Sequence, residues 1–259
     1  MASSMQDPDE RPKRALIIAN DEYHRENRLD NCVSNAQQLD NKLKSINFKV
    51  QTAYNLAKHE MINNIIDFSK TIGDGDLVLF YFSGHGYQVD NNNYLMPVDD
   101  DRIENTRDVE DFAVNVEQMF SRLVKANRSY VNIFILDCCR PYALKSKSGA
   151  SRKRYYCLSN KICFCNVLAM SEDIGLHKME ASDGCLIQFA CGVNQTAKND
   201  LFAEHLLRNI AEENADVSDL FRRITDGVYR ESNRRQQPFS ANELRHHKQV
   251  YLHSKYLLC

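Results

Sequence analysis

The sequence predicts an α/β fold with a mostly parallel sheet covered by helices. In its N-terminal half, short runs rich in β-branched and aromatic residues alternate with segments of helical apolar spacing. Two of the runs, 76–82 and 131–136, are apolar except for Asp76 and Asn132, as is typical of strands buried on both faces. Each run ends abruptly in polar residues. Because open α/β sheets place their chemistry at the carboxyl ends of strands, we expect a site at these two ends.

The composition fits a globular chain with a sizeable core. It has 259 residues, of which 43% are hydrophobic, and a formal net charge of −2. This charge gives no attraction for nucleic acid, and the apolar runs are too short to cross a membrane, so we expect neither partner. The N-terminus lacks the apolar segment of a signal peptide. The nine cysteines have irregular spacing, so we expect reduced thiols and a cytoplasmic location.

The N-terminal elements follow one another in the order β-α-β-α-β. The apolar spacing predicts strands at 14–20, 48–53 and 76–82, and helices at 34–45 and around 61–68. This alternation is the pattern of a parallel sheet with helices on its faces. Residues 1–12 are polar and carry two prolines, and we expect them to be a disordered leader.

The later elements are a mixture of helices and strands. The pattern predicts helices at 115–125, 201–210 and 217–229, and strands at 131–137, 166–170, 185–191 and 249–252. The stretch 145–154 is basic and has no apolar period, which predicts an exposed loop. We expect one domain, 13–253, with a larger part at 13–144, an exposed loop region at 145–165, a smaller part at 166–253 and a tail at 254–259. A sheet edge at 249–252 would favour a homodimer.

A histidine and a cysteine stand at the ends of the two buried runs. His85 lies in the Ser-Gly-His-Gly motif at 83–86, and Cys139 lies in the Asp-Cys-Cys motif at 137–139. A thiol attacks an amide only as the thiolate, so it needs a neighbouring imidazole to take its proton. We therefore predict a catalytic dyad of His85 and Cys139. The backbone N–H groups of Gly86 and Cys139 would form the oxyanion hole. Each residue alone would be read as structural.

The motifs at 82–87 and 136–140 resemble the two catalytic motifs of caspase-like cysteine peptidases (clan CD), most closely those of paracaspases and metacaspases. A histidine roughly 50 residues before the cysteine is typical of caspases. Segments at 14–20, 29–36, 95–99 and 190–196 also look like family segments, so the resemblance covers about residues 13–253. It implies a caspase-type three-layer sandwich with a mostly parallel six-stranded sheet flanked by helices. It also implies an endopeptidase that acts on proteins or peptides without a cofactor. The family nucleophile follows Leu-Asp-X, which selects Cys139 and leaves Cys138 as a buried filler.

The resemblance further implies cleavage after Arg or Lys, with acidic residues holding the cation in the S1 pocket. Asp137 matches one of these acids, whereas Asn35 and Asn194 stand where two others are expected. An amide still accepts hydrogen bonds but lacks the strength of a charged acceptor. We therefore expect a basic P1 preference with weakened affinity, and a shift towards neutral P1 residues stays open. The alternative is a catalytically weak or inactive domain that acts as a dimerising scaffold.

Other candidate sites have simpler explanations. Cys157, Cys163 and Cys165 lack the paired Cys-X2-Cys spacing of zinc sites. The consecutive acids at 99–101 lack the alternation that lets carboxylates converge on calcium. We expect no metal and no cofactor. The basic loop at 145–154 is either a self-cleavage site or a solvated surface loop.

Overall fold

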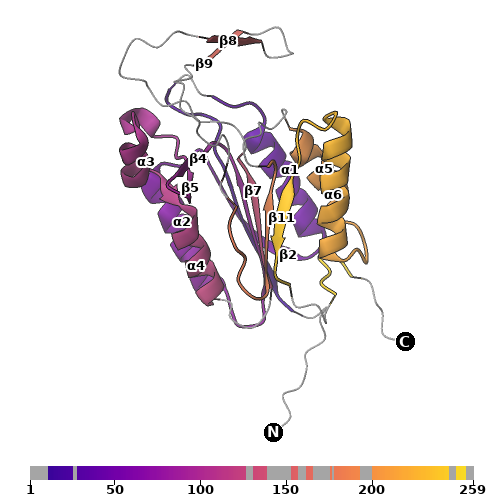
Figure 1. The fold of residues 1–259 in the computed structure, drawn as a ribbon. Coiled ribbons are helices and arrows are strands. Elements are labelled where there is room, and N and C mark those ends of the chain that lie inside the picture. The colour runs from indigo at the N-terminus through magenta and orange to yellow at the C-terminus, as the bar shows by residue number, and fades with distance from the viewer. Residues whose placement is uncertain are drawn as a thin grey trace, which may run out of the picture.

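The fold is a three-layer α/β sandwich (Figure 1). It is seen in a computed structural model that describes residues 11–25, 28–126, 131–138, 153–156, 162–165, 176, 178–192, 200–244 and 249–254. Its six-stranded sheet has the order β11-β10-β7-β3-β1-β2. The strands are β1 (Lys13–Ala19), β2 (Phe48–Tyr54), β3 (Leu77–Ser83), β7 (Val131–Asp137), β10 (Cys185–Phe189) and β11 (Phe239–Asn242). Every neighbouring pair is parallel except β10 and β11. The predicted fold class is confirmed.

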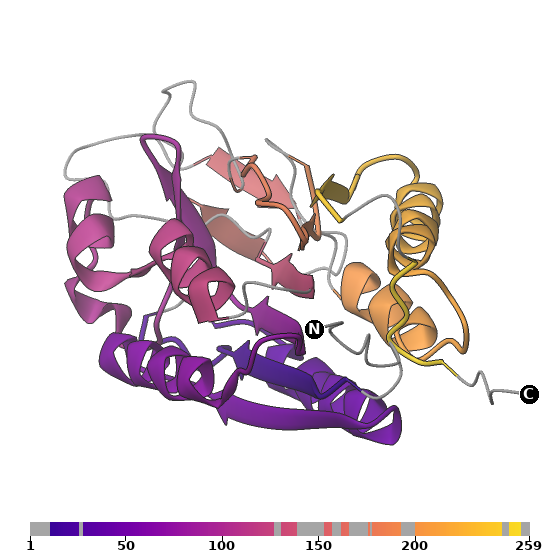
Figure 2. The same cartoon turned by 90° about the horizontal axis from the view of Figure 1, so that it is seen from below.

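Helices cover both faces of the sheet (Figures 1 and 2). One face carries α1 (Cys32–Ser45), α5 (Leu201–Asn209) and α6 (Val217–Glu231), and the other carries α2 (Lys58–Thr71) and α4 (Val116–Ala126). Each helix turns its apolar stripe towards the sheet, as an amphipathic sequence requires. The helices expected from apolar spacing are all present, with ends that differ by a few residues.

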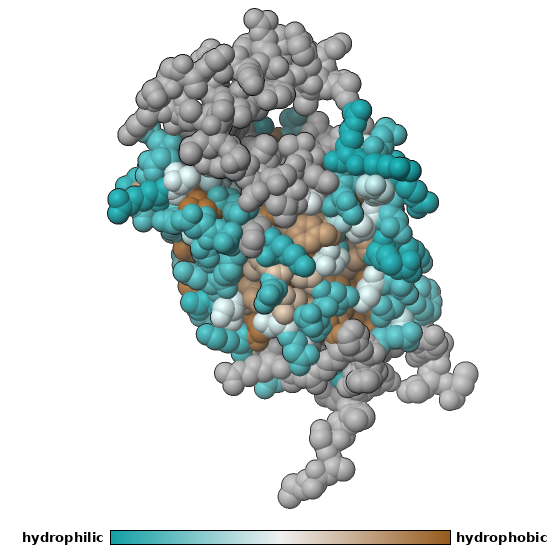
Figure 3. Space-filling model, in the orientation of Figure 1, coloured by the Kyte–Doolittle hydropathy of each residue, from teal (hydrophilic) through white to brown (hydrophobic). Residues whose placement is uncertain are grey.

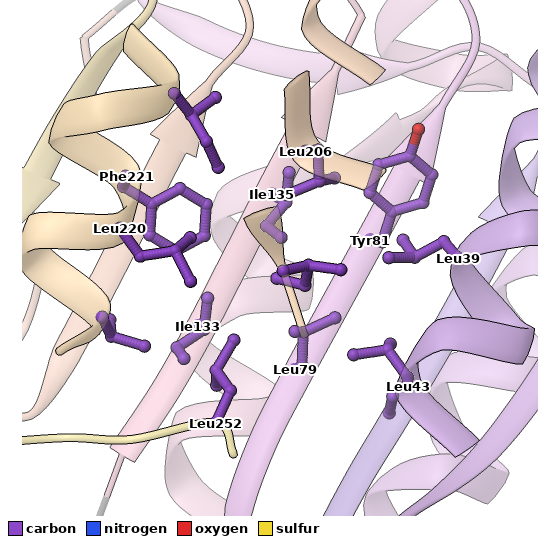
Figure 4. Packing of buried hydrophobic residues seen from close by; sticks show 14 of the residues in the cluster. Leu39, Leu43, Leu79, Tyr81, Ile133, Ile135, Leu206, Leu220, Phe221 and Leu252 are labelled. Atoms are coloured by element: carbon purple, nitrogen blue, oxygen red, sulfur yellow. The ribbon is translucent and has the colours of Figure 1, made fainter. Parts of the chain in front are cut away.

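The central strands are mostly apolar because both of their faces are buried. In β3, alternate residues enter opposite hydrophobic clusters: 77, 79 and 81 join one, and 78, 80 and 82 join the other. Figure 4 shows one of these clusters, in which Leu79 and Ile133 of the sheet meet Leu39 of α1 and Phe221 of α6. The sheet is therefore a rigid base for the residues at the ends of its strands.

Several elements differ from the prediction. The structure adds α3 (Thr106–Phe112), the short η2 (Asp100–Arg102) and a three-stranded sheet of β4 (Gly86–Val89), β5 (Asn92–Leu95) and β6 (Val114–Asn115). The region 145–165, expected as a loop, contains the antiparallel pair β8 (Lys153–Tyr156) and β9 (Ile162–Cys165). The rest of that region, the leader up to residue 10, the expected strand at 166–170 and the tail beyond 254 lie outside the described residues.

The prediction of a last strand at 249–252 is wrong. Only Tyr251 forms a β-bridge there, with Asp216 at the start of α6. The sheet edge is instead β11, which pairs with β10 in antiparallel register. The 249–252 segment is held by hydrogen bonds between Val250 and the start of α6, and by Val250 and Leu252, whose side chains belong to the core.

Two further expectations were that the cysteines are reduced and that no segment spans a membrane. Cys32, Cys138 and Cys185 are buried free thiols, whereas Cys191 is disulfide-bonded. The expectation that the cysteines are reduced is therefore wrong at Cys191. Within the described ranges, every helix is too short or too polar to cross a bilayer.

Candidate active site

His85 lies two residues after the end of β3 and is fixed by backbone bonds on both sides. Ser83, the last residue of β3, is paired with Asp137, the last residue of β7. The Gly84 N–H donates to the Asp137 carbonyl at 3.3 Å, and the His85 carbonyl accepts from the Met96 N–H at 3.0 Å. The ends of the two buried strands therefore meet, as their sequences predicted, and His85 sits where they meet. Its side chain is largely buried.

Tyr23 supports His85 and was not predicted. The His85 backbone N–H donates to the Tyr23 hydroxyl at 2.7 Å, and the two ring centroids are 4.6 Å apart. The hydroxyl in turn donates to the Met96 carbonyl at 3.3 Å. Tyr23 is fully buried, and this burial raises the pKa of its hydroxyl well above the ordinary value. Tyr23 therefore stays protonated and holds the backbone of His85 from the loop that follows β1.

The glycines that flank His85 provide space. A Cβ on Gly84 would lie 2.6 Å from the Tyr23 hydroxyl and 2.8 Å from the ring of Phe82. A Cβ on Gly86 would lie 3.1 Å from both the Cβ and the carbonyl oxygen of Cys138. Neither glycine needs a left-handed backbone, since the described glycines with positive φ are Gly75 and Gly184. The physical reason for the Gly-His-Gly motif is thus close backbone approach.

Cys138, the first of the two thiols after β7, is buried as the sequence predicted. Cys138 is 1% exposed, and burial followed by the nearby Asp137 carboxylate raises the pKa of its thiol well above the ordinary value. Cys138 is therefore held as a neutral thiol and is unsuited to act as a nucleophile. Cys139 lies outside the described residues. The described chain brings its predecessor, Cys138, against Gly86, the residue that follows His85.

Asp137 ends β7 and is held by a buried hydroxyl. Tyr81 of β3 donates from its hydroxyl to Asp137 Oδ2 at 3.0 Å. The hydroxyl of Tyr81 lies at the end of the buried cluster in Figure 4. Burial, and then the charge of Asp137, raise the pKa of Tyr81, so it remains a donor. The carboxylate predicted for the S1 pocket therefore has one oxygen fixed at the end of the sheet.

The structure connects the predicted S1 residue Asn35 to an acid that the sequence did not suggest. The Asn35 side-chain amide donates to Asp200 Oδ1 at 3.3 Å, and Asn31 donates to Asp200 Oδ2 at 2.7 Å. Asp200 stands at the start of α5, and both asparagines stand at the start of α1. Asn194 lies outside the described residues. No sequence motif marked Asp200, because it is distant in the chain from every residue it contacts.

The acidic run at 99–101 joins loops of the protein. Asp99 accepts the Lys58 backbone N–H at 3.0 Å at the start of α2, and Asp101 lies 2.6 Å from the ring of His24. The carboxylates thus turn towards separate protein partners. Among the described residues, no group of three or more His, Cys, Asp or Glu side chains is placed to hold a metal ion.

The fold and the strand-end motifs together define a caspase-like α/β domain. Residues 12–249 match the family model of the caspase domain, so the chain belongs to the caspase-domain family of peptidases. The resemblance drawn from the motifs is therefore confirmed. Over 131 residues the chain is 31% identical to the human mucosa-associated lymphoid tissue lymphoma translocation protein 1 and to its mouse homolog. The aligned part is 49% of this chain and 15% of each relative, so the chain spans a small fraction of those proteins.

Proposed function

We propose that the chain is a cysteine endopeptidase that cleaves after Arg or Lys with a Cys139–His85 dyad. The observation that carries the proposal is the junction of β3 and β7. It fixes His85 beside the residue that precedes Cys139, through the Gly84 to Asp137 backbone bond and the close approach of Gly86 to Cys138. Family membership supports the same reaction class.

The proposed reaction passes through an acyl-enzyme. His85 takes the thiol proton of Cys139, and the thiolate attacks the scissile carbonyl carbon. The N–H groups of Gly86 and Cys139 bind the resulting oxyanion. His85 then gives its proton to the leaving amine, and the C–N bond breaks. A water molecule, deprotonated by His85, attacks the thioester, and collapse of that second intermediate releases the acid product and restores the thiol.

One acid at the end of β7, Asp137, supports the proposed basic P1 preference. Asp137 presents a carboxylate held by Tyr81, and a guanidinium or ammonium group forms charge-assisted hydrogen bonds with such a group. Asn35 contributes a neutral amide where an acid was expected. We therefore propose that the enzyme binds Arg and Lys at P1 more weakly than an all-acid pocket would.

A panel of fluorogenic peptides with Arg, Lys, Asn or Asp at P1 tests this function. We expect turnover after Arg and Lys that is lost in Cys139→Ala and His85→Ala. Cys138→Ala is the matched control, because it removes the neighbouring buried thiol and should keep activity. Cleavage after Asn or Asp alone would contradict the specificity. Equal loss in both cysteine variants would contradict the choice of nucleophile.

The alternative function, a dimerising scaffold, is favoured by the edge of the sheet. The middle of the face shown in Figure 3, where Figure 1 draws β11, gathers hydrophobic residues between hydrophilic helices. Phe239 and Ala241 of β11 are only partly buried, and Phe239 stacks on Phe189 at 4.4 Å. An open strand edge of this kind can pair with a second copy.

We propose a homodimer through β11, with or without activity. Sedimentation of the wild type should show a dimer, and Ala241→Lys should shift it to a monomer because a lysine on an edge strand blocks pairing. A wild-type monomer at all concentrations would refute the dimer. A well-folded dimer without turnover in the peptide panel would favour the scaffold function.

A further inference from the structure

Asn31 and Asp200 begin two different helices in the same unusual way. Asn31 precedes α1 with φ 69°, and Asp200 precedes α5 with φ 59°, so both have a left-handed backbone. Residues at this position usually turn their side chains onto their own helix. Here neither does, and the Asn31 amide donates to the Asp200 carboxylate at 2.7 Å instead.

Asn35 is a second hydrogen-bond donor to the Asp200 carboxylate. Asn35 donates to the second oxygen of Asp200 at 3.3 Å, so the amides of α1 bind both carboxylate oxygens. Amides are neutral donors, and they hold the carboxylate without cancelling its charge. An ionised acid at position 35 could not donate and would repel Asp200. The amide at 35 and the acid at 200 therefore fit each other as a pair.

This pair lies at the end of the sheet that carries Asp137. Cys32, the first residue of α1, shares a hydrophobic cluster with Tyr81. Tyr81 is the residue that holds Asp137. α1 follows the carboxyl end of β1, and α5 follows that of β10, so the first turn of α1 and Asp200 lie at the end of the sheet that carries Asp137.

We propose that Asp200 is a specificity-determining residue that supplies the negative charge missing at Asn35 and receives a cationic P1 side chain together with Asp137. This inference rests on the proposed peptidase function and identifies which acid completes its S1 pocket. In this arrangement the acid stands at the start of α5, and the amide at 35 donates to it from α1.

The competing explanation is that the three side chains only join α1 to α5. The two explanations differ in how they depend on substrate. Loss of a structural link lowers turnover of every peptide by the same factor. Loss of an S1 charge lowers turnover of peptides with Arg or Lys at P1 and spares a matched peptide with a neutral P1 residue.

The test compares Asp200→Asn with the exchanged pair Asn35→Asp/Asp200→Asn, using peptides with Arg or with neutral citrulline at P1. In Asp200→Asn we expect kcat/KM for the Arg peptide to fall about tenfold to hundredfold relative to the citrulline peptide, which is the range for a hydrogen bond to a charged group. The exchanged pair keeps one acid and reverses the donor and acceptor, so it should regain most of the preference. Asp67→Asn removes the same charge from an exposed pair with Lys70 on α2 and should change neither peptide.

An unchanged ratio of the two peptides in folded Asp200→Asn would overturn this inference alone. A wild type that cleaves no Arg or Lys peptide would overturn the proposed function and this inference with it. Thermal melting reports whether each variant folds. If Asp200→Asn does not fold, the exchanged pair decides: a folded exchanged pair without the Arg preference refutes the proposal.

Discussion

Replacing Tyr23 by Phe tests how the fold positions His85. The change removes one hydroxyl and keeps the ring whose centroid lies 4.6 Å from that of the imidazole. The His85 N–H then loses an acceptor at 2.7 Å in a fully buried place. The Met96 carbonyl keeps a bond from the Asn20 amide at 3.1 Å, so the cost falls on His85.

The magnitude follows from the burial of that donor. A buried N–H that loses its partner costs about 1–3 kcal/mol, and we expect the free energy of unfolding of Tyr23→Phe to fall by this amount. A displaced His85 also lowers the chemical step, and we expect kcat to fall about tenfold to hundredfold. The KM for an Arg peptide should be unchanged, because Tyr23 contacts His85 and is not among the residues proposed to bind P1.

Urea unfolding followed by circular dichroism suits the stability measurement, because the chain has no tryptophan. Steady-state hydrolysis of an Arg peptide separates kcat from KM. Tyr94→Phe is the matched control, since it removes the hydroxyl of another buried tyrosine, on β5, and should keep kcat. Wild-type stability and kcat in Tyr23→Phe would refute the positioning role. A raised KM with an unchanged kcat would assign Tyr23 to substrate binding.

Two further predictions concern stability. Gly227 of α6 faces His205 of α5, and a Cβ there would lie 2.4 Å from the imidazole Cε1. Gly227→Ala should therefore lower the free energy of unfolding by about 1–3 kcal/mol. An unchanged urea midpoint would contradict this, because it would show that α5 and α6 accommodate the added methyl group without loss of stability. Burial raises the pKa of the Cys185 thiol to about 12, above its ordinary value near 9. Between these two values only the unfolded thiol ionises, so stability should fall as the pH rises above about 9. Cys185→Ala should make that fall smaller, and an identical pH profile would contradict this assignment.

The sequence predicted the central sheet because its strands carry their own signal. The run at 77–82 is buried on both faces. A short apolar run of this kind, bounded by glycines and acids, is typical of a buried strand. The edge strand β11 lacks this signal, since its Phe-Ser-Ala-Asn sequence is half polar and its place depends on the open side of β10. The apolar residues at 249–252 imitated a strand, although they serve to fill the core under α6.

Some of the site residues were likewise predictable from the sequence, and others were not. His85 and Asp137 were predictable because strand ends are visible in the sequence, and the parallel pairing of β3 with β7 brings them together. Tyr23, Tyr81 and Asp200 were not, because each contacts a site residue that is 62, 56 or 165 positions away. Their roles depend on tertiary contacts, and a tyrosine or an aspartate in a chain carries no pattern that announces such a contact. The sequence showed an amide at position 35 where an acid was expected. The structure explains this amide by its hydrogen bond to the Asp200 carboxylate.

The most direct test of the central claim is to identify the thiol that attacks a substrate-like electrophile. A peptide with Arg at P1 and an acyloxymethyl ketone at its carboxyl end would be incubated with wild type, His85→Ala and Cys138→Ala near neutral pH. Peptide mass spectrometry would then locate the adduct. The proposed dyad predicts an adduct on Cys139 in the wild type and in Cys138→Ala, and little or none in His85→Ala. An adduct on another cysteine, or one on Cys139 that forms equally well without His85, would contradict it.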